Sequence, residues 1–137
     1  MDRRTFLTSS CSICLLTGVG ILDSSCATVP VFSTSIKGDR IEIPARLFLD
    51  RPLQIVHVEG FAYEIAVERK EDKYRAFVLQ CTHAENPLTF TGNRFVCSLH
   101  GSTFDTNGGV TKGPADRPLK ELKTQISGST IEVVLNS

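Results

Sequence analysis

The chain lacks an excess of charge of either sign: its 137 residues carry 15 lysines and arginines against 15 aspartates and glutamates. Nucleic-acid-binding domains usually present a strongly basic face, so this balance argues against a nucleic acid as the partner. The chain also has no internal repeat and no low-complexity tract, which excludes a repeat architecture. Its length corresponds to one domain.

Helical periodicity is missing from residues 36–137, where no segment shows a convincing apolar stripe. β-branched and aromatic runs of strand length recur instead, among them "RIEIP", "LQIVHVEG", "FAYEIAVERK" and "KYRAFVLQ". "LTFTGNRFV" has the pattern of a hairpin, and "LKELKTQISGSTIEVVLN" that of two strands around Ser127-Gly128. Residues 28–36 favour a linker or a first edge strand. Short strands at close spacing predict an all-β fold, an antiparallel sandwich or barrel.

The first 30 residues have the layout of an export signal. "MDRR" supplies a basic start, residues 5–22 form an uncharged and largely apolar run, and small residues follow it. The adjacent arginines in "RRTFL" resemble the twin-arginine signal, which exports proteins that are already folded. That route suits a protein that receives its cofactor in the cytoplasm.

This signal sets the expected domain boundaries. Residues 1–27 are expected to be a twin-arginine-type export signal or a membrane anchor, residues 28–35 a linker, and residues 36–137 the folded domain. Cleavage after Ala27, lipidation of Cys26 and retention as an anchor all remain open, as does a buried N-terminal helix.

Cysteine and histidine are scarce in the predicted domain, and they occur together. Its only cysteines, Cys81 and Cys97, are each followed within three residues by a histidine, His83 and His100. A disulfide does not need a neighbouring histidine, whereas a metal centre does. His57, within a predicted strand, has no such neighbour and is expected to be an ordinary strand residue.

Each Cys–His pair follows a strand-like run and precedes turn formers, so two loops on a β scaffold could bring two thiolates and two imidazoles together. Two cysteines and two histidines suit tetrahedral zinc or a histidine-ligated [2Fe–2S] cluster. Zinc fingers usually pair cysteine with cysteine. Here each loop carries one residue of each type, which favours a binuclear cluster and leaves a zinc-stabilised binding module as the non-redox alternative.

The segments "CTH", "CSLHGSTFD" and "GGVTKGPADRPL" resemble, in this order, the Rieske iron–sulfur family. The resemblance extends over roughly residues 36–135 and implies an all-β fold of small stacked sheets with two cluster-binding loops. It also implies one [2Fe–2S] cluster per chain. Cys81 and Cys97 would bind the inner iron, and His83 and His100 the outer, more exposed iron.

The resemblance assigns further positions around the cluster. Ser102 matches a serine that hydrogen-bonds a cluster sulfide, and Gly113-Pro114-Ala115 matches the proline loop that covers the cluster. Phe104 stands where a tyrosine is expected, so a hydroxyl is missing. Asn86 and Leu99 stand where respiratory members carry a disulfide. With fewer hydrogen bonds to sulfur, the expected reduction potential lies in the lower or middle part of the family window of about −150 to +300 mV.

The implied function is electron transfer by an exported subunit of a cytochrome bc-type quinol-oxidising complex, in which a quinol could dock on His83 or His100. The expected partners are cytochrome b- or c-type proteins or an oxidoreductase large subunit. The expected location is the periplasm or the periplasmic face of the cytoplasmic membrane, with membrane association through the N-terminus possible. A Rieske ferredoxin and the small subunit of a periplasmic molybdenum oxidoreductase such as arsenite oxidase are alternatives. A self-sufficient oxygenase is not expected, because 137 residues leave no room for a mononuclear-iron domain.

Overall fold

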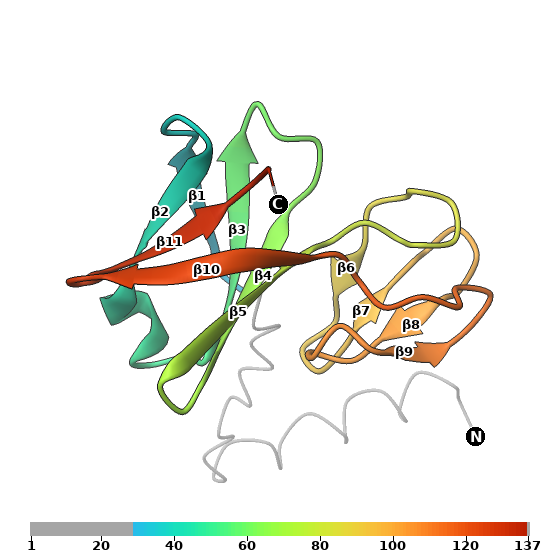
Figure 1. Cartoon of the computed structure of the whole chain (residues 1–137). Coiled ribbons are helices and arrows are strands. Elements are labelled where there is room, and N and C mark those ends of the chain that lie inside the picture. The colour runs from blue at the N-terminus through green and yellow to red at the C-terminus, as the bar shows by residue number, and fades with distance from the viewer. Residues whose placement is uncertain (1–28, 137) are drawn as a thin grey trace, which may run out of the picture.

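A computed structural model describes residues 29–136, so the export signal expected for residues 1–27 lies outside the described residues. The described part is almost entirely β and forms two sheets, seen as separate lobes in Figure 1. Its elements in chain order are β1 (Val31–Ser35), β2 (Arg40–Pro44), the 3-10 helix η1 (Ala45–Phe48), β3 (Leu53–Glu59), β4 (Ile65–Lys70), β5 (Lys73–Val78), β6 (Thr89–Phe90), β7 (Phe95–Val96), β8 (Thr103–Phe104), β9 (Val110–Lys112), β10 (Glu121–Ser127) and β11 (Thr130–Val134).

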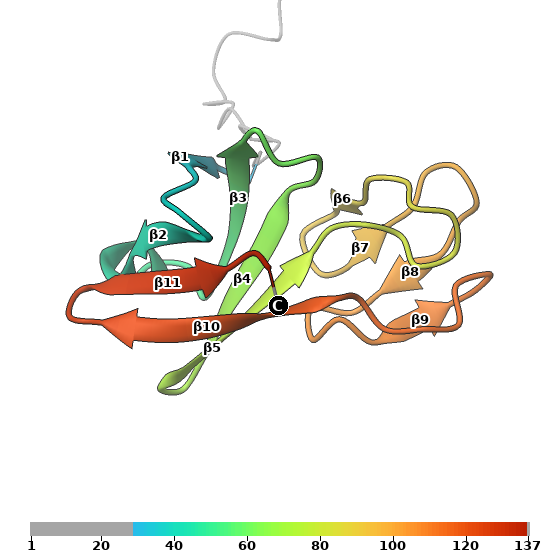
Figure 2. The same ribbon diagram turned by 45° about the horizontal axis from the view of Figure 1, so that its top comes forward.

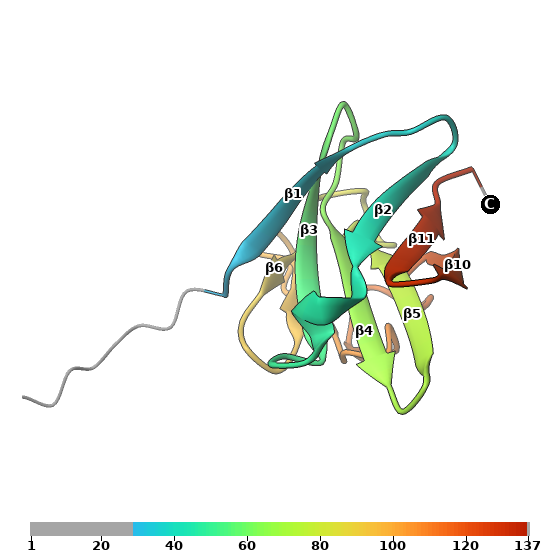
Figure 3. The same cartoon turned by 90° about the vertical axis from the view of Figure 1, so that its left-hand side faces the viewer.

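The larger sheet has seven strands in the order β1-β3-β4-β5-β10-β11-β2, and the smaller sheet has the order β6-β7-β8-β9. The chain leaves the larger sheet after β5, builds the whole smaller sheet, and returns as β10 beside β5 (Figure 2). Viewed from the side of β1 and β2, the smaller sheet lies behind the larger one (Figure 3). The smaller lobe is therefore an insertion between two neighbouring strands.

Strands β2 and β11, which are neighbours at one side of the larger sheet, alternate between buried and half-buried residues. In β2, Ile41 and Ile43 are fully buried, and they pair with Val133 and Ile131 of β11, which are also fully buried. Alternate side chains of a strand point to opposite faces, so only one face of these strands enters the core. Burying each such side chain contributes about 1.5–3 kcal/mol of transfer free energy.

The central strands β3, β4 and β5 instead each contain three consecutive buried residues, because both faces are covered in that part of the sheet. In β4, Ile65 and Val67 join the main core of the larger sheet, while Ala66 faces the opposite way with Ile55 and Phe77. That second core continues into the smaller lobe and includes Phe95, Cys81 and Cys97, among others. Strands buried on both faces show this continuous pattern.

The expected all-β, antiparallel fold is confirmed, with one departure within the described residues. Strand β1 pairs in parallel with β3, because β2 and η1 intervene and bring the chain back in the same direction. The first strand thus begins before the domain boundary expected at residue 36, and Val31–Ser35 is an edge strand. Among residues 29–136, no helix has the length and apolar character needed to cross a lipid bilayer.

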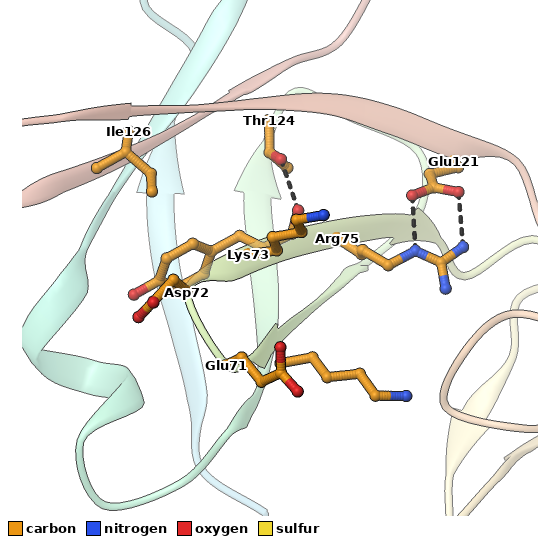
Figure 4. A pocket seen from close by; sticks show the side chains of 9 residues that line it. Glu71, Asp72, Lys73, Arg75, Glu121, Thr124 and Ile126 are labelled. Atoms are coloured by element: carbon orange, nitrogen blue, oxygen red, sulfur yellow. Dashed lines mark hydrogen bonds and ion pairs between the residues drawn. The ribbon is translucent and has the colours of Figure 1, made fainter.

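A groove of about 560 Å³ opens where β5 and β10 diverge (Figure 4). The two strands pair only where Glu121 and Leu122 meet Phe77 and Ala76. Beyond that point the Thr124 hydroxyl donates to the Tyr74 carbonyl at 2.7 Å and bridges the gap. At the closed end, Arg75 donates two hydrogen bonds of 2.8 Å to the Glu121 carboxylate.

This ion pair predicts a pH-dependent stability difference. The hydrogen bonds from Arg75 lower the pKa of Glu121, so the pair stabilises the fold at neutral pH and loses this contribution as the pH falls below the ordinary glutamate value of 4.5. Both side chains are more than one-third exposed, so Glu121→Gln should lower the free energy of unfolding by only about 0.5–1 kcal/mol at pH 7. Urea unfolding at pH 7 and pH 3 measures this difference, which should shrink at pH 3.

The matched control is Glu59→Gln, since Glu59 is exposed and its carboxylate forms no hydrogen bond or ion pair within the described part of the chain. It should change the stability little at either pH. An equal loss for Glu121→Gln at both pH values would contradict an electrostatic contribution from the pair.

Candidate metal centre

Two short loops of matching backbone geometry carry the Cys–His pairs. Loop 1 (residues 81–86) follows β5, and loop 2 (residues 97–102) follows β7. In loop 1 the Cys81 N–H donates to the Asn86 carbonyl at 2.7 Å, and the Glu85 N–H donates to the Cys81 carbonyl at 2.8 Å. In loop 2 the Cys97 N–H donates to the Ser102 carbonyl, and the Gly101 N–H to the Cys97 carbonyl, both at 2.9 Å. The same two bonds therefore close both loops.

The two loops also share a left-handed residue at their fifth position. Gly101 has φ +77° in loop 2, and Glu85 has φ +56° in loop 1. Glycine adopts this conformation freely, whereas a residue with a side chain is strained in it. Loop 1 therefore holds a strained turn where loop 2 does not.

The two cysteines lie at the protected side of the site. Both are fully buried and are not joined in a disulfide, and Cys81 is near enough to Cys97 to lower the pKa of its thiol. Burial by itself raises the pKa of Cys97, but the backbone N–H groups of His100 and Leu99, together with Cys81, outweigh this effect and lower the pKa below its ordinary value of 9.0. This shift moves the protonation equilibrium of Cys97 toward the thiolate, which is the metal-binding form.

The two histidines lie at the open side. Both are exposed, and their rings pack edge to face with centroids 4.9 Å apart and an interplanar angle of 82°. His57 is far from them in sequence, in β3, and is exposed without a cysteine near it in the strand. The structure therefore pairs thiol with thiol and imidazole with imidazole.

This pairing fits a [2Fe–2S] cluster, in which one iron takes two cysteines and the other takes two histidines. Across residues 29–136, no three histidine, cysteine, aspartate or glutamate side chains converge as a group for one metal ion. The buried thiols agree with the inner position expected for Cys81 and Cys97, and the exposed rings with the outer position expected for His83 and His100. The residues present fit the cluster.

The segment after β9 ties the two loops together. The Ala115 N–H donates to the Ser102 hydroxyl at 3.0 Å, and Ser102 is fully buried. Arg117 and Thr82 exchange two bonds: the Thr82 hydroxyl donates to the Arg117 carbonyl at 2.7 Å, and the Arg117 guanidinium donates to the Thr82 carbonyl at 3.1 Å. The expected proline loop, with exposed Gly113 and Pro114 joined by a cis peptide bond, thus contacts loop 2 through Ala115, and Arg117, two residues beyond it, contacts loop 1.

The structure also places Ser102 and Phe104, the two other positions that the resemblance singles out near the cluster. Ser102 accepts from Ala115, which leaves its own hydroxyl proton to donate. Phe104 is fully buried in β8 and pairs with Phe95 of β7, so no hydroxyl is present at this point of the core.

Sequence reasoning missed three contacts that support the loops. Thr82 and Arg117 lie inside recognised segments, but their mutual bonds connect residues 35 positions apart. Tyr63, whose hydroxyl donates to the Glu85 carbonyl at 2.8 Å, lies in none of the motifs. No local pattern marks such a contact.

Comparison with known proteins agrees with this geometry. The chain is 42% identical over 53 residues to the cytochrome b6-f complex iron-sulfur subunit 2 of Nostoc sp. (strain PCC 7120 / SAG 25.82 / UTEX 2576), which covers 39% of this chain and 28% of that protein. It is 49% identical over 37 residues to the cytochrome b6-f complex iron-sulfur subunit of Prochlorococcus marinus (strain MIT 9515), covering 26% and 21%. The aligned segments span less than a third of these curated relatives.

Solved structures show the same fold. The plasma membrane Rieske protein PetC3 from Synechocystis PCC 6803 matches with a TM-score of 0.53 and 27% identity, over 67% of this chain and 96% of that chain. A chain of a hyperthermophilic respiratory complex III matches at a TM-score of 0.52 and 21% identity, over 66% and 71%, and shows the fold alone. The family model for the Rieske [2Fe-2S] domain matches residues 48–123, more than half of the chain, and the chain therefore belongs to the Rieske [2Fe–2S] family.

Proposed function

We propose that this protein transfers single electrons through a [2Fe–2S] cluster bound by Cys81 and Cys97 at the inner iron and by His83 and His100 at the outer iron. The pairing of two buried thiols with each other and of two exposed imidazoles with each other carries this proposal. The cluster, when bound, accepts and releases one electron. The exposed edge of the histidine pair is where a partner can approach most closely.

The ligand set itself raises the reduction potential. Replacing two thiolates by neutral imidazoles removes two negative charges from the centre, so an added electron meets less repulsion. The backbone N–H groups that reach the Cys97 sulfur and the free hydroxyl proton of Ser102 act in the same direction. Phe104 supplies no such donor, which supports a value in the lower or middle part of the family window of about −150 to +300 mV.

We place the protein as an exported subunit of a cytochrome bc-type quinol-oxidising complex. Support comes from the relatives described above, which are subunits of cytochrome b6-f complexes, and from the export layout of residues 1–27. The described domain would face the periplasm, free or held at the membrane by that segment. The exposed His83 and His100 would then meet a quinol or a cytochrome.

A Rieske ferredoxin serving an oxygenase is the second candidate, favoured by one observation. Asn86 and Leu99 occupy the positions where respiratory members carry linked cysteines, so the disulfide that joins the two loops in those members has no counterpart here. Purification of the tagged full-length chain from the membrane fraction and from the soluble fraction separates the two functions. Haem that co-purifies from membranes supports the bc-type complex, and a haem-free partner that co-purifies from the soluble fraction supports the ferredoxin.

The cofactor is tested directly by metal and sulfide analysis of the purified protein. We expect about two irons and two acid-labile sulfides per chain, and a reduced-state EPR signal of a histidine-ligated cluster. Zinc in stoichiometric amount with no labile sulfide would instead support the zinc-stabilised module and refute electron transfer here.

A further inference from the structure

Tyr63 connects the main core of the larger sheet to loop 1. It lies in the connection between β3 and β4, and its ring packs against that core. Its hydroxyl donates to the Glu85 carbonyl at 2.8 Å and accepts a hydrogen bond from the Gln80 side-chain amide at 3.3 Å. A rigid aromatic ring anchored at one end thus reaches the loop at the other.

The contacted residue is the strained one. Glu85 is in the left-handed conformation, at φ +56°, and it directly precedes Asn86, whose carbonyl accepts the Cys81 N–H. Its own N–H closes the turn that carries His83 by donating to the Cys81 carbonyl. If Glu85 left this conformation, both closing bonds of loop 1 would be disturbed, and His83 would move with them.

Loop 2 has the same turn without the strained residue. The equivalent position there is Gly101, which adopts φ +77° without a steric penalty, and the described residues show no side-chain hydrogen bond to its carbonyl. The two loops thus share one backbone design, but only loop 1 combines a non-glycine turn residue with a tyrosine at its carbonyl. The hydrogen bond lies where the backbone is strained.

We propose that Tyr63 is a positioning residue, which holds the left-handed turn at Glu85 and thereby fixes loop 1 and His83 for cluster binding. The proposal rests on the proposed function for the cluster, but the effect on the loop itself does not. Gln80, directly before Cys81, orients the Tyr63 hydroxyl toward the loop.

Three readouts on the full-length protein test it. Tyr63→Phe removes only the hydroxyl, so hydrogen–deuterium exchange of the peptide spanning residues 80–88 should accelerate about fivefold, the fold-change expected for one lost hydrogen bond. Loss of the cluster to an iron chelator should accelerate by about the same factor. The EPR lines should also broaden, because the His83 geometry becomes less uniform.

The chain offers a matched control and a rescue. Tyr74→Phe changes the chain's other tyrosine, which packs edge to face on Phe48 away from both loops, and should leave the exchange and the EPR lines unchanged. Adding Glu85→Gly to Tyr63→Phe should restore slow exchange and narrow lines, because glycine holds the turn without support.

Equal behaviour of Tyr63→Phe and Tyr74→Phe would overturn the proposal, and so would a failure of Glu85→Gly to restore the loop. If no variant, nor the unaltered protein, contains iron and sulfide, the proposed function fails. The exchange rates of residues 80–88 then still decide the role of Tyr63.

Discussion

Replacing His100 with alanine should leave the purified protein almost without iron and labile sulfide. The outer iron would lose one of its two protein ligands at the exposed side of the site, where water and chelators have direct access. Altering a residue that only supports a metal ligand already costs about 10–100-fold in metal affinity, and removing a ligand costs more. We therefore expect cluster content to fall at least about tenfold from roughly two irons per chain.

The control for this change is His57→Ala, which alters an exposed histidine of β3 and should leave iron, sulfide and the EPR signal unchanged. Because His100 is also exposed, its removal creates no cavity in the core, and far-UV circular dichroism should show that the sheets still form. Full cluster content in His100→Ala would refute the ligand assignment while leaving the fold intact.

Gly108→Ala should be among the most destabilising single substitutions in the domain. Gly108 lies in the turn between β8 and β9 at φ +81°, and a Cβ there would come within 2.8 and 2.9 Å of two Phe77 ring atoms. Left-handed strain costs about 1–2 kcal/mol, and overpacking a core adds about 1–3 kcal/mol. We expect a loss of about 3 kcal/mol, or roughly 10–20 °C in the melting temperature.

Gly128→Ala separates the two contributions. Gly128, in the β10–β11 turn, has φ +58°, but a Cβ there meets nothing within 4 Å. It should cost only the backbone term, about 1 kcal/mol, in thermal or urea unfolding. Similar losses for Gly108→Ala and Gly128→Ala would mean that Phe77 moves aside and that the contact between the two sheets is loose.

The sequence predicted correctly those parts of the fold that depend on interactions between residues close together in the chain. The hairpin within "LTFTGNRFV", the two strands around Ser127-Gly128 and the strand-like run of β2 all depend on residues close in the chain. The parallel pairing of Val31–Ser35 with β3 depends on a crossover that no local pattern records. Strands β8 and β9 have only two and three residues, too few to show a period.

The same division explains the candidate site. The loop closures within residues 81–86 and 97–102 follow from nearby turn residues, whereas the bonds from Tyr63 and Arg117 span 22 and 35 positions. Such contacts are decided by how the two sheets pack, so only the structure shows them.

The connectivity of the chain would allow the smaller lobe to be cut out, but its removal would expose apolar side chains of the larger sheet to water. Its two ends lie together, since the Val78 N–H donates to the Lys120 carbonyl at 3.0 Å, so a short turn could replace residues 79–120. The excision would nevertheless uncover Ile55, Ala66 and Phe77 on the outer face of the sheet. A cluster module grafted onto another scaffold would therefore have to bring along an apolar sheet face, and the stripped sheet would be prone to aggregation.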